Sequence, residues 1–99
     1  SLKTSSFGLC YDLGNASFYG RSIINDFKSF NKYIYEIHIK DRDVSGNNVY
    51  LGEGTVRFNE FKSEYPKLQK LKNLIFETNT FSHPLEVISK NIKFMRAYL

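Results

Sequence analysis

Hydrophobic and polar residues alternate along two segments of the chain, which predicts two half-buried β-strands. The first strand covers residues 7–13. The second covers residues 33–40, where aromatic and aliphatic side chains hold the odd positions and polar ones the even positions from Glu36 onward. The segment between them, residues 16–31, carries many apolar side chains without a sustained period. We therefore expect a partly packed connection there, which can include a helical turn near Asp26.

A third extended run, residues 49–58, follows a turn-forming sequence at residues 45–48. Glycine and asparagine in that turn tolerate positive φ, so the second and third runs are expected to pair as an antiparallel hairpin. Gly52 and Gly54 fall on one side of the third run, which indicates a bulge or tight curvature. These patterns predict a three-stranded antiparallel sheet.

Beyond Phe58 the apolar period changes from two to about 3.6 residues, which predicts helices. The first helix is capped by Asn59; either it kinks at Pro66, or it restarts at Ser63 with the proline in its first turn. A loop is expected over residues 73–83, and Pro84 opens a final helix. The predicted fold is α+β, a three-stranded antiparallel sheet followed by a helical subdomain.

Length and composition favour a single domain over residues 1–99. The chain has 41% hydrophobic residues and sixteen aromatic ones, enough for one packed core. No apolar run approaches the length of a membrane span. Cys10 has no partner for a disulfide, which favours the cytoplasm. Because the chain lacks an initiator methionine and stops at Leu99 within a helical pattern, we expect a domain excised from a longer protein.

The net charge of +4 is unevenly distributed. Basic and acidic residues balance up to Val56, and the whole excess lies from Arg57 onward. One interpretation is a solvated, lysine-bearing helix face. The other is a basic patch that binds phosphates or anionic lipid.

No group of residues in the sequence suggests catalysis. His38 lies on the polar side of a strand and His83 precedes a proline, so both are interpreted as surface histidines rather than metal ligands. Cys10 lies within a strand pattern and is interpreted as a small buried hydrophobe. We therefore expect no catalytic residue, no metal, no cofactor and no enzymatic activity.

Arg57 is the residue with the clearest binding potential. It lies where the third run meets the first helix, and a guanidinium group beside a helix N-terminus suits a phosphate. The alternative is a surface arginine paired with Glu60 or Glu53.

Several short motifs together resemble the phox-homology (PX) family. They are Tyr33-Ile34-Tyr35-Glu36-Ile37, Val56-Arg57-Phe58-Asn59-Glu60-Phe61, Leu68-Gln69-Lys70-Leu71 and Met95-Arg96-Ala97-Tyr98-Leu99. The resemblance spans roughly Phe7 to Leu99. It implies a sorting-nexin-like module of protein transport, which binds phosphoinositides, most often phosphatidylinositol 3-phosphate, as a peripheral protein on endosomal or vacuolar membranes.

The resemblance also implies roles for individual residues. Arg57 would bind the 3-phosphate and Phe58 would pack on the inositol ring, with Lys72 and Lys90 adding charge. The expected loop before the last helix would enter the membrane, or its apolar residues would be core contacts beneath a loop. These residues are Leu74, Ile75, Phe76 and Phe81.

The sequence departs from the family pattern in three places. Val56 and Asn91 stand where the family has arginines, and the proline-rich stretch with its phosphate-binding lysine is absent. The alternative is therefore a degenerate PX-like scaffold that binds proteins. Other proteins are possible partners through the parent chain. Nucleic acid is a disfavoured partner, because the aromatic residues alternate with apolar ones in strand patterns and so belong to a core.

Overall fold

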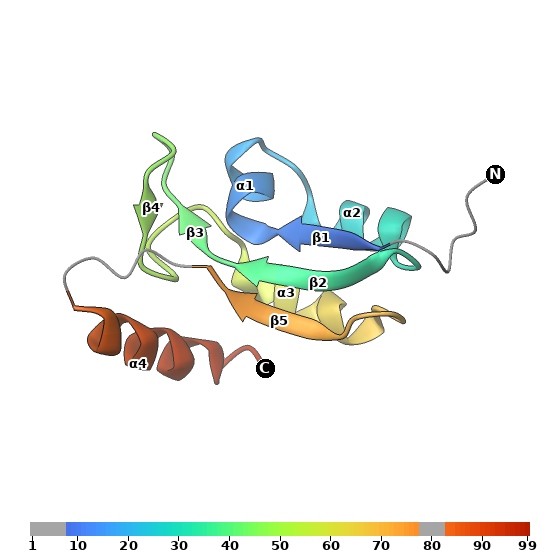
Figure 1. Cartoon of the computed structure of the whole chain (residues 1–99). Helices are drawn as coiled ribbons and strands as arrows, with labels where there is room; N and C mark the ends of the chain where they lie inside the picture. The colour runs from blue at the N-terminus through green and yellow to red at the C-terminus, as the bar shows by residue number, and fades with distance from the viewer. Residues whose placement is uncertain (1–7, 78–82) are drawn as a thin grey trace.

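The main sheet of the protein is parallel. The computed structural model describes residues 8–77 and 83–99. Strands β1 (Leu9–Asp12), β2 (Ile34–Ile39) and β5 (Asn73–Phe76) form one sheet in the order β1-β2-β5, and their arrows all point the same way (Figure 1). The α+β content agrees with the sequence-based prediction, but the three-stranded antiparallel sheet was wrong.

Two helices occupy the segment that was expected to be an irregular connection. They are α1 (Leu13–Phe18) and α2 (Ile23–Phe30). Asp12 and Ser22 cap them, since each side chain accepts a hydrogen bond from the backbone N–H three residues further on. Gly20, at a φ of 74°, lets the chain turn between the two helices.

Only a short part of the expected hairpin forms. Strands β3 (Asp41–Arg42) and β4 (Asn48–Val49) pair antiparallel around a turn in which Gly46 has a φ of 90°. Residues 50–57 of the predicted third strand form a loop wrapped around the carboxylate of Asp41, which is 1% exposed. This carboxylate accepts backbone N–H bonds of 2.9–3.0 Å from Arg42, Gly52, Gly54 and Val56. The loop backbone therefore bonds to a side chain instead of extending the sheet.

The third strand of the sheet comes from the segment predicted to be a loop. Helix α3 (Phe58–Glu64) ends in a 3-10 turn, η2 (Tyr65–Lys67), which has Pro66 in its first turn. This helical segment returns the chain to the end of the sheet at which β1 and β2 begin. Strand β5 therefore runs parallel to β2, with Leu74 opposite Ile37. The direction of β5 follows from this crossover. The alternation of hydrophobic and polar residues within a strand does not reveal such a crossover.

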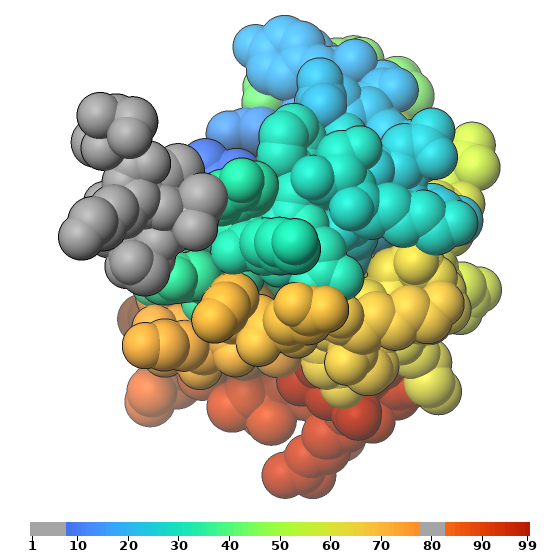
Figure 2. Space-filling model, turned by 90° about the vertical axis from the view of Figure 1, so that its right-hand side faces the viewer, coloured from blue at the N-terminus to red at the C-terminus, as the bar shows by residue number. Residues whose placement is uncertain are grey.

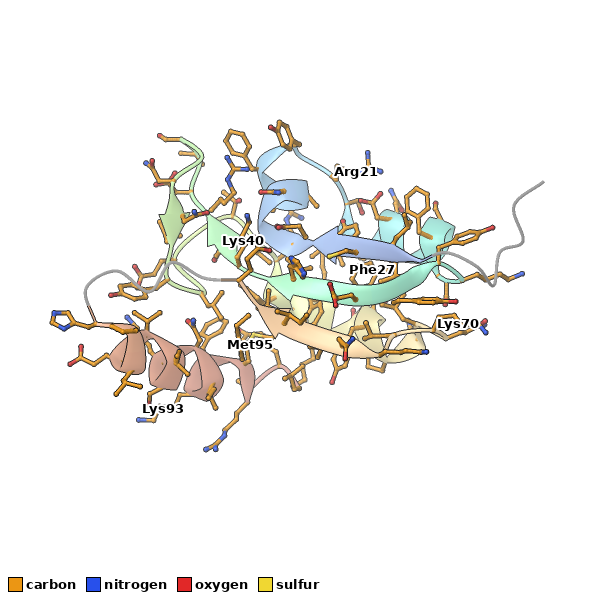
Figure 3. The ribbon with its side chains drawn as sticks, viewed as in Figure 1. Arg21, Phe27, Lys40, Lys70, Lys93 and Met95 are labelled. Atoms are coloured by element: carbon orange, nitrogen blue, oxygen red, sulfur yellow. The ribbon has the colours of Figure 1, made fainter. Side chains whose placement is uncertain are left out.

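The last helix, α4 (Pro84–Met95), begins at the predicted proline. In the view from the amino ends of the strands, α1 lies at the top of the molecule and α4 at the bottom (Figure 2). The core lies between the sheet and the helices. Phe27 of α2 and Phe61 of α3 meet edge to face there, with ring centroids 6.4 Å apart. Met95 of α4 is 1% exposed and completes the core (Figure 3).

The two faces of the parallel sheet differ in character. Ile37 and Ile39 of β2 are 0% and 1% exposed and face the helices α2 and α3, which lie behind the sheet in Figure 1. The opposite face carries polar side chains, and no helix of the described part of the chain crosses it. They are Cys10, Asp12, Glu36, His38, Lys40 and Glu77. Parallel sheets are ordinarily covered on both faces, so this polar face is unusual.

Within the described residues, no helix is both long and apolar enough to cross a membrane.

Candidate functional site

One imidazole and two carboxylates meet at the carboxyl end of the parallel sheet. The side chains are Asp12, His38 and Glu77, and one donor atom from each lies within 4.8 Å of the others. All three belong to the polar face, and each comes from the end of a different strand. Carboxyl ends of parallel strands are where ligands bind in β/α proteins generally.

Strand register brings these three groups together. Asp12 and His38 are partner positions on β1 and β2, and His38 is in turn opposite Ile75 of β5. Glu77 follows β5 directly, and its backbone N–H donates to the Ile39 carbonyl at 3.1 Å. The backbone of the sheet therefore fixes the position of each candidate ligand.

Asp12 has two roles in this arrangement. Its Oδ1 accepts the Asn15 N–H at 2.8 Å and so caps α1. Its Oδ2 lies 3.3 Å from Nζ of Lys40, whose side chain is only 15% exposed. The helix cap orients the carboxylate of Asp12. Its second oxygen faces the ammonium group of Lys40, which occupies part of the site.

His38 lies between two glutamates. Its Nδ1 contacts Glu77, and its Nε2 lies 3.0 Å from Oε2 of Glu36. Partial burial lowers the pKa of His38, but the hydrogen bonds to both carboxylates outweigh that effect and raise the pKa above its usual value. A histidine that binds a metal uses one ring nitrogen for the ion, and a carboxylate often accepts the N–H of the other ring nitrogen. Glu36 is placed for that supporting role.

Cys10 extends the polar face on the strand next to Glu36. The two residues are partner positions in the sheet. Burial and a hydrogen bond with Glu36 raise the pKa of Cys10 to about 11. The sequence-based interpretation of a buried hydrophobe was wrong, because the Cys10 residue is exposed and belongs to the polar face, although its thiol is partly covered beside Glu36.

The Asp12, His38 and Glu77 donor set suits a divalent transition metal. Imidazole nitrogen is typical of Zn²⁺ and other transition metals, and carboxylate oxygen of Mn²⁺ and Mg²⁺. Three protein ligands leave further coordination positions for water or a substrate oxygen, as in catalytic metal sites. The sequence predicted no metal ligand, and His38 was interpreted as an ordinary surface histidine.

Arg57 and Phe58 occupy different environments from each other. The Arg57 side chain is 79% exposed, and its Nη1 lies 3.3 Å from Oε2 of Glu60, the pairing considered as an alternative. Phe58 is 4% exposed and packs against the rings of Phe94 and Tyr98, with centroids 5.1 and 5.6 Å away. Phe58 therefore contributes to the core, and its packing on an inositol ring stays a prediction.

The two lysines expected to assist Arg57 lie elsewhere. Lys72 is exposed, with its Nζ 5.7 Å from the ring centroid of Tyr35. Lys90 lies 3.6 Å from Glu53 and over the ring of Tyr50. Neither lysine lines the cavities beside Arg57. The basic residues predicted for one pocket are thus dispersed.

A different basic residue does accompany Arg57. Arg21 and Arg57 line one cavity of about 390 Å³, together with Ser17, Ser22 and Thr55. Arg21 forms two hydrogen bonds of 2.7 and 2.8 Å with Asp26, so its charge is already partnered. The sequence offered no sign of this second arginine, because it lies far from Arg57 along the chain.

The predicted membrane-entering loop is a strand. Leu74, Ile75 and Phe76 form most of β5; Leu74 packs against the core, while Ile75 and Phe76 are 40% and 39% exposed. Phe81 lies outside the described residues. Membrane insertion of these side chains stays a prediction, but the loop conformation assumed for it was wrong.

Comparison with known proteins supplies no relative: neither the models of known protein families nor the curated proteins contain a match for this chain.

Proposed function

We propose that this chain supplies a divalent-metal site of a metal-dependent enzyme, with Asp12, His38 and Glu77 as protein ligands. The observation that carries the proposal is the convergence of these three donor groups, within 4.8 Å of one another, at the carboxyl end of a parallel sheet. Mn²⁺ and Zn²⁺ are the ions that best suit one nitrogen and two oxygen donors. The expectation of a non-enzymatic module stays untested, and the geometry favours the opposite.

Topology supports the same proposal. The three parallel strands follow the same order in the sheet as in the chain, with the β3-β4 hairpin inserted between β2 and β5, and α2 and α3 lie on one side of them. This is the arrangement of consecutive units of a β/α barrel, where the helices form the outer layer and the strand ends carry the active site. The polar face described above would then point toward the barrel interior.

The chain's own residues suggest how such a site would work. A bound divalent metal would polarise a hydroxyl, carbonyl or phosphoryl oxygen of the substrate, or lower the pKa of a bound water. Glu36 would accept the His38 N–H and keep the ring oriented. Lys40 would leave Asp12 when the ion binds, and its ammonium group would then be available to an anionic substrate.

Equilibrium titration with Mn²⁺ and Zn²⁺ tests the assignment. We expect the wild-type chain to bind one ion, and D12N, H38Q and E77Q to bind at least about tenfold more weakly. Asparagine still caps a helix, so D12N removes a ligand while it preserves α1. E60Q, which changes a carboxylate outside the cluster, is the matched control. Unchanged affinity in all three ligand variants would refute the site.

Phosphoinositide binding is the second candidate, and the cavity shared by Arg21 and Arg57 is the observation that favours it. In that case the protein would act at endosomal or vacuolar membranes. Co-sedimentation with liposomes that contain phosphatidylinositol 3-phosphate tests it: R21A and R57A should each reduce binding, and K70A should not. Binding that neither arginine variant changes would count against this candidate and leave the protein-binding scaffold as the alternative.

A further inference from the structure

A second group of potential metal ligands lies on the other side of the His38 ring. Cys10, Glu36 and His38 each offer a donor atom within 4.8 Å of the other two. Cys10 and Glu36 are partner positions on β1 and β2, and both side chains belong to the polar face. This group shares only His38 with the ligand set of the proposed function.

The imidazole separates the two groups. Its Nε2 faces Glu36 at 3.0 Å, whereas its Nδ1 contacts Glu77. A neutral imidazole has one nitrogen that accepts and one that carries a proton, so it binds a metal through a single nitrogen at a time. An ion on the Cys10 side therefore requires the ring tautomer that cannot bind an ion on the Asp12 side.

The two groups also differ in their affinity for classes of metal. Thiolate is a soft ligand that selects ions such as Zn²⁺ and Cd²⁺, whereas two carboxylates suit harder ions such as Mn²⁺. We propose that Cys10, Glu36 and His38 form a second, thiolate-containing site for a soft divalent cation, which competes with the Asp12–Glu77 side for the His38 ring. The competition rests on the proposed function, but the thiolate site itself does not.

The geometry requires only a small adjustment. Zinc binds thiolate at about 2.3 Å and imidazole nitrogen at about 2.0 Å, so tetrahedral ligands lie roughly 3.5 Å apart. The present separations reach up to 4.8 Å. The Cys10 residue is exposed and the Glu36 side chain is 32% exposed, so both can approach the ion by rotation of their side chains. On binding, the sulfur–metal bond forms and the thiol proton passes to solvent.

Titration of the purified chain with Co²⁺ and Cd²⁺, under a phosphine reductant, tests this site. Thiolate coordination produces a charge-transfer absorption band, in the near ultraviolet for Co²⁺ and at shorter ultraviolet wavelengths for Cd²⁺. We expect wild type to show the band at one equivalent of metal. C10S should lose the band and bind Cd²⁺ at least about tenfold more weakly, while it retains its Mn²⁺ affinity. E36Q should weaken Cd²⁺ binding with the band reduced.

The D12N/E77Q double variant separates this proposal from the first. It should keep the charge-transfer band and the Cd²⁺ affinity while it loses Mn²⁺ binding. Saturating Cd²⁺ should lower the Mn²⁺ affinity of wild type by at least about tenfold and leave that of C10S unchanged. Absence of the band in wild type, or its persistence in C10S, would overturn the thiolate site. Simultaneous binding of both ions without interference would overturn the competition, and a band without any Mn²⁺ binding would refute only the first proposal.

Discussion

Asp12 and His38 are partner positions on two neighbouring parallel strands. Both side chains lie on the polar face, so the register alone brings a carboxylate and an imidazole together. This relationship is a property of the backbone pairing and persists when a side chain is shortened. Variants at these positions therefore report on ligand chemistry more than on folding.

Thermal stability should depend on metal. An ion that binds only the folded chain stabilises it by about 2.7 kcal/mol at a free concentration one hundred times its dissociation constant. For a domain of this size, that stabilisation corresponds to a rise in Tm of roughly 10 °C or more. Calorimetry with Mn²⁺, before and after a chelator, measures the effect. E77Q should show little of the shift, and an equal shift in E77Q would contradict the assignment.

Replacement of Lys40 by methionine should strengthen metal binding. The ammonium group lies 3.3 Å from an oxygen of Asp12 and repels an incoming cation. Removal of this charge should raise Mn²⁺ affinity severalfold, an effect of roughly 1 kcal/mol. K70M is the matched control, because Lys70 lies at the opposite end of the sheet (Figure 3). Weaker binding by K40M would instead indicate that the lysine helps to hold the site together.

Asp41→Asn should be strongly destabilising. The buried carboxylate accepts four backbone N–H groups, and an asparagine amide group would direct N–H donors at some of them. Urea unfolding should show a loss of about 2–4 kcal/mol. D43N serves as the control, since Asp43 organises an exposed turn in which asparagine is also suitable. Similar losses of unfolding free energy in the two variants would mean that the buried hydrogen bonds of Asp41 stabilise the fold no more than the exposed ones of Asp43.

Gly52→Ala should cost more than Gly20→Ala. Both glycines have positive φ, at 90° and 74°, so both variants incur a backbone penalty of about 1–2 kcal/mol. A methyl group at Gly52 would also lie 2.5 Å from the Phe94 ring, whereas at Gly20 it would meet open space. We expect a further loss of about 1–3 kcal/mol at Gly52 by chemical denaturation. Equal losses would show that the Phe94 ring moves aside freely.

The Asp26 carboxylate should make stability depend on acid pH. Burial raises its pKa, but hydrogen bonds from Arg21 and Tyr11 outweigh this and hold the pKa below the ordinary value. Its contribution is therefore complete above about pH 4 and is lost as the pH falls through the folded-state pKa. D26N should be less stable than wild type by about 1–2 kcal/mol at pH 7. That difference should shrink toward pH 2 in denaturant titrations, and a constant difference would exclude this ionic contribution.

The elements with strong periodicity were predictable from sequence. Alternation identified β1 and β2, and the 3.6-residue period with Pro84 identified α4. The short helices α1 and α2 were not identified, although their caps, Asp12 and Ser22, are of a residue type that marks a helix start. Short helices with scattered apolar positions give no clear period.

Strand direction and the site were beyond the reach of local patterns. The apolar run Leu74-Ile75-Phe76 fits a buried strand as well as an exposed loop, and nothing within it shows which neighbour it pairs with. Asp12, His38 and Glu77 stand far apart in the chain and share no motif. Their position at strand ends becomes a signal only when the strands are known to be parallel, because only then do those ends meet.

The loop anchored by Asp41 has a consequence for how this protein can change over generations. Its shape depends on backbone groups bonded to one buried carboxylate, and on the glycine conformation at Gly52. Leu51 and Val56 of the loop also pack into the core, and the Thr55 hydroxyl donates to the Arg42 carbonyl, so these side chains share in holding that shape. Substitutions at an exposed position such as Glu53 can, by contrast, accumulate without loss of the fold, so the outer surface of the loop is free to diverge while its buried base is retained.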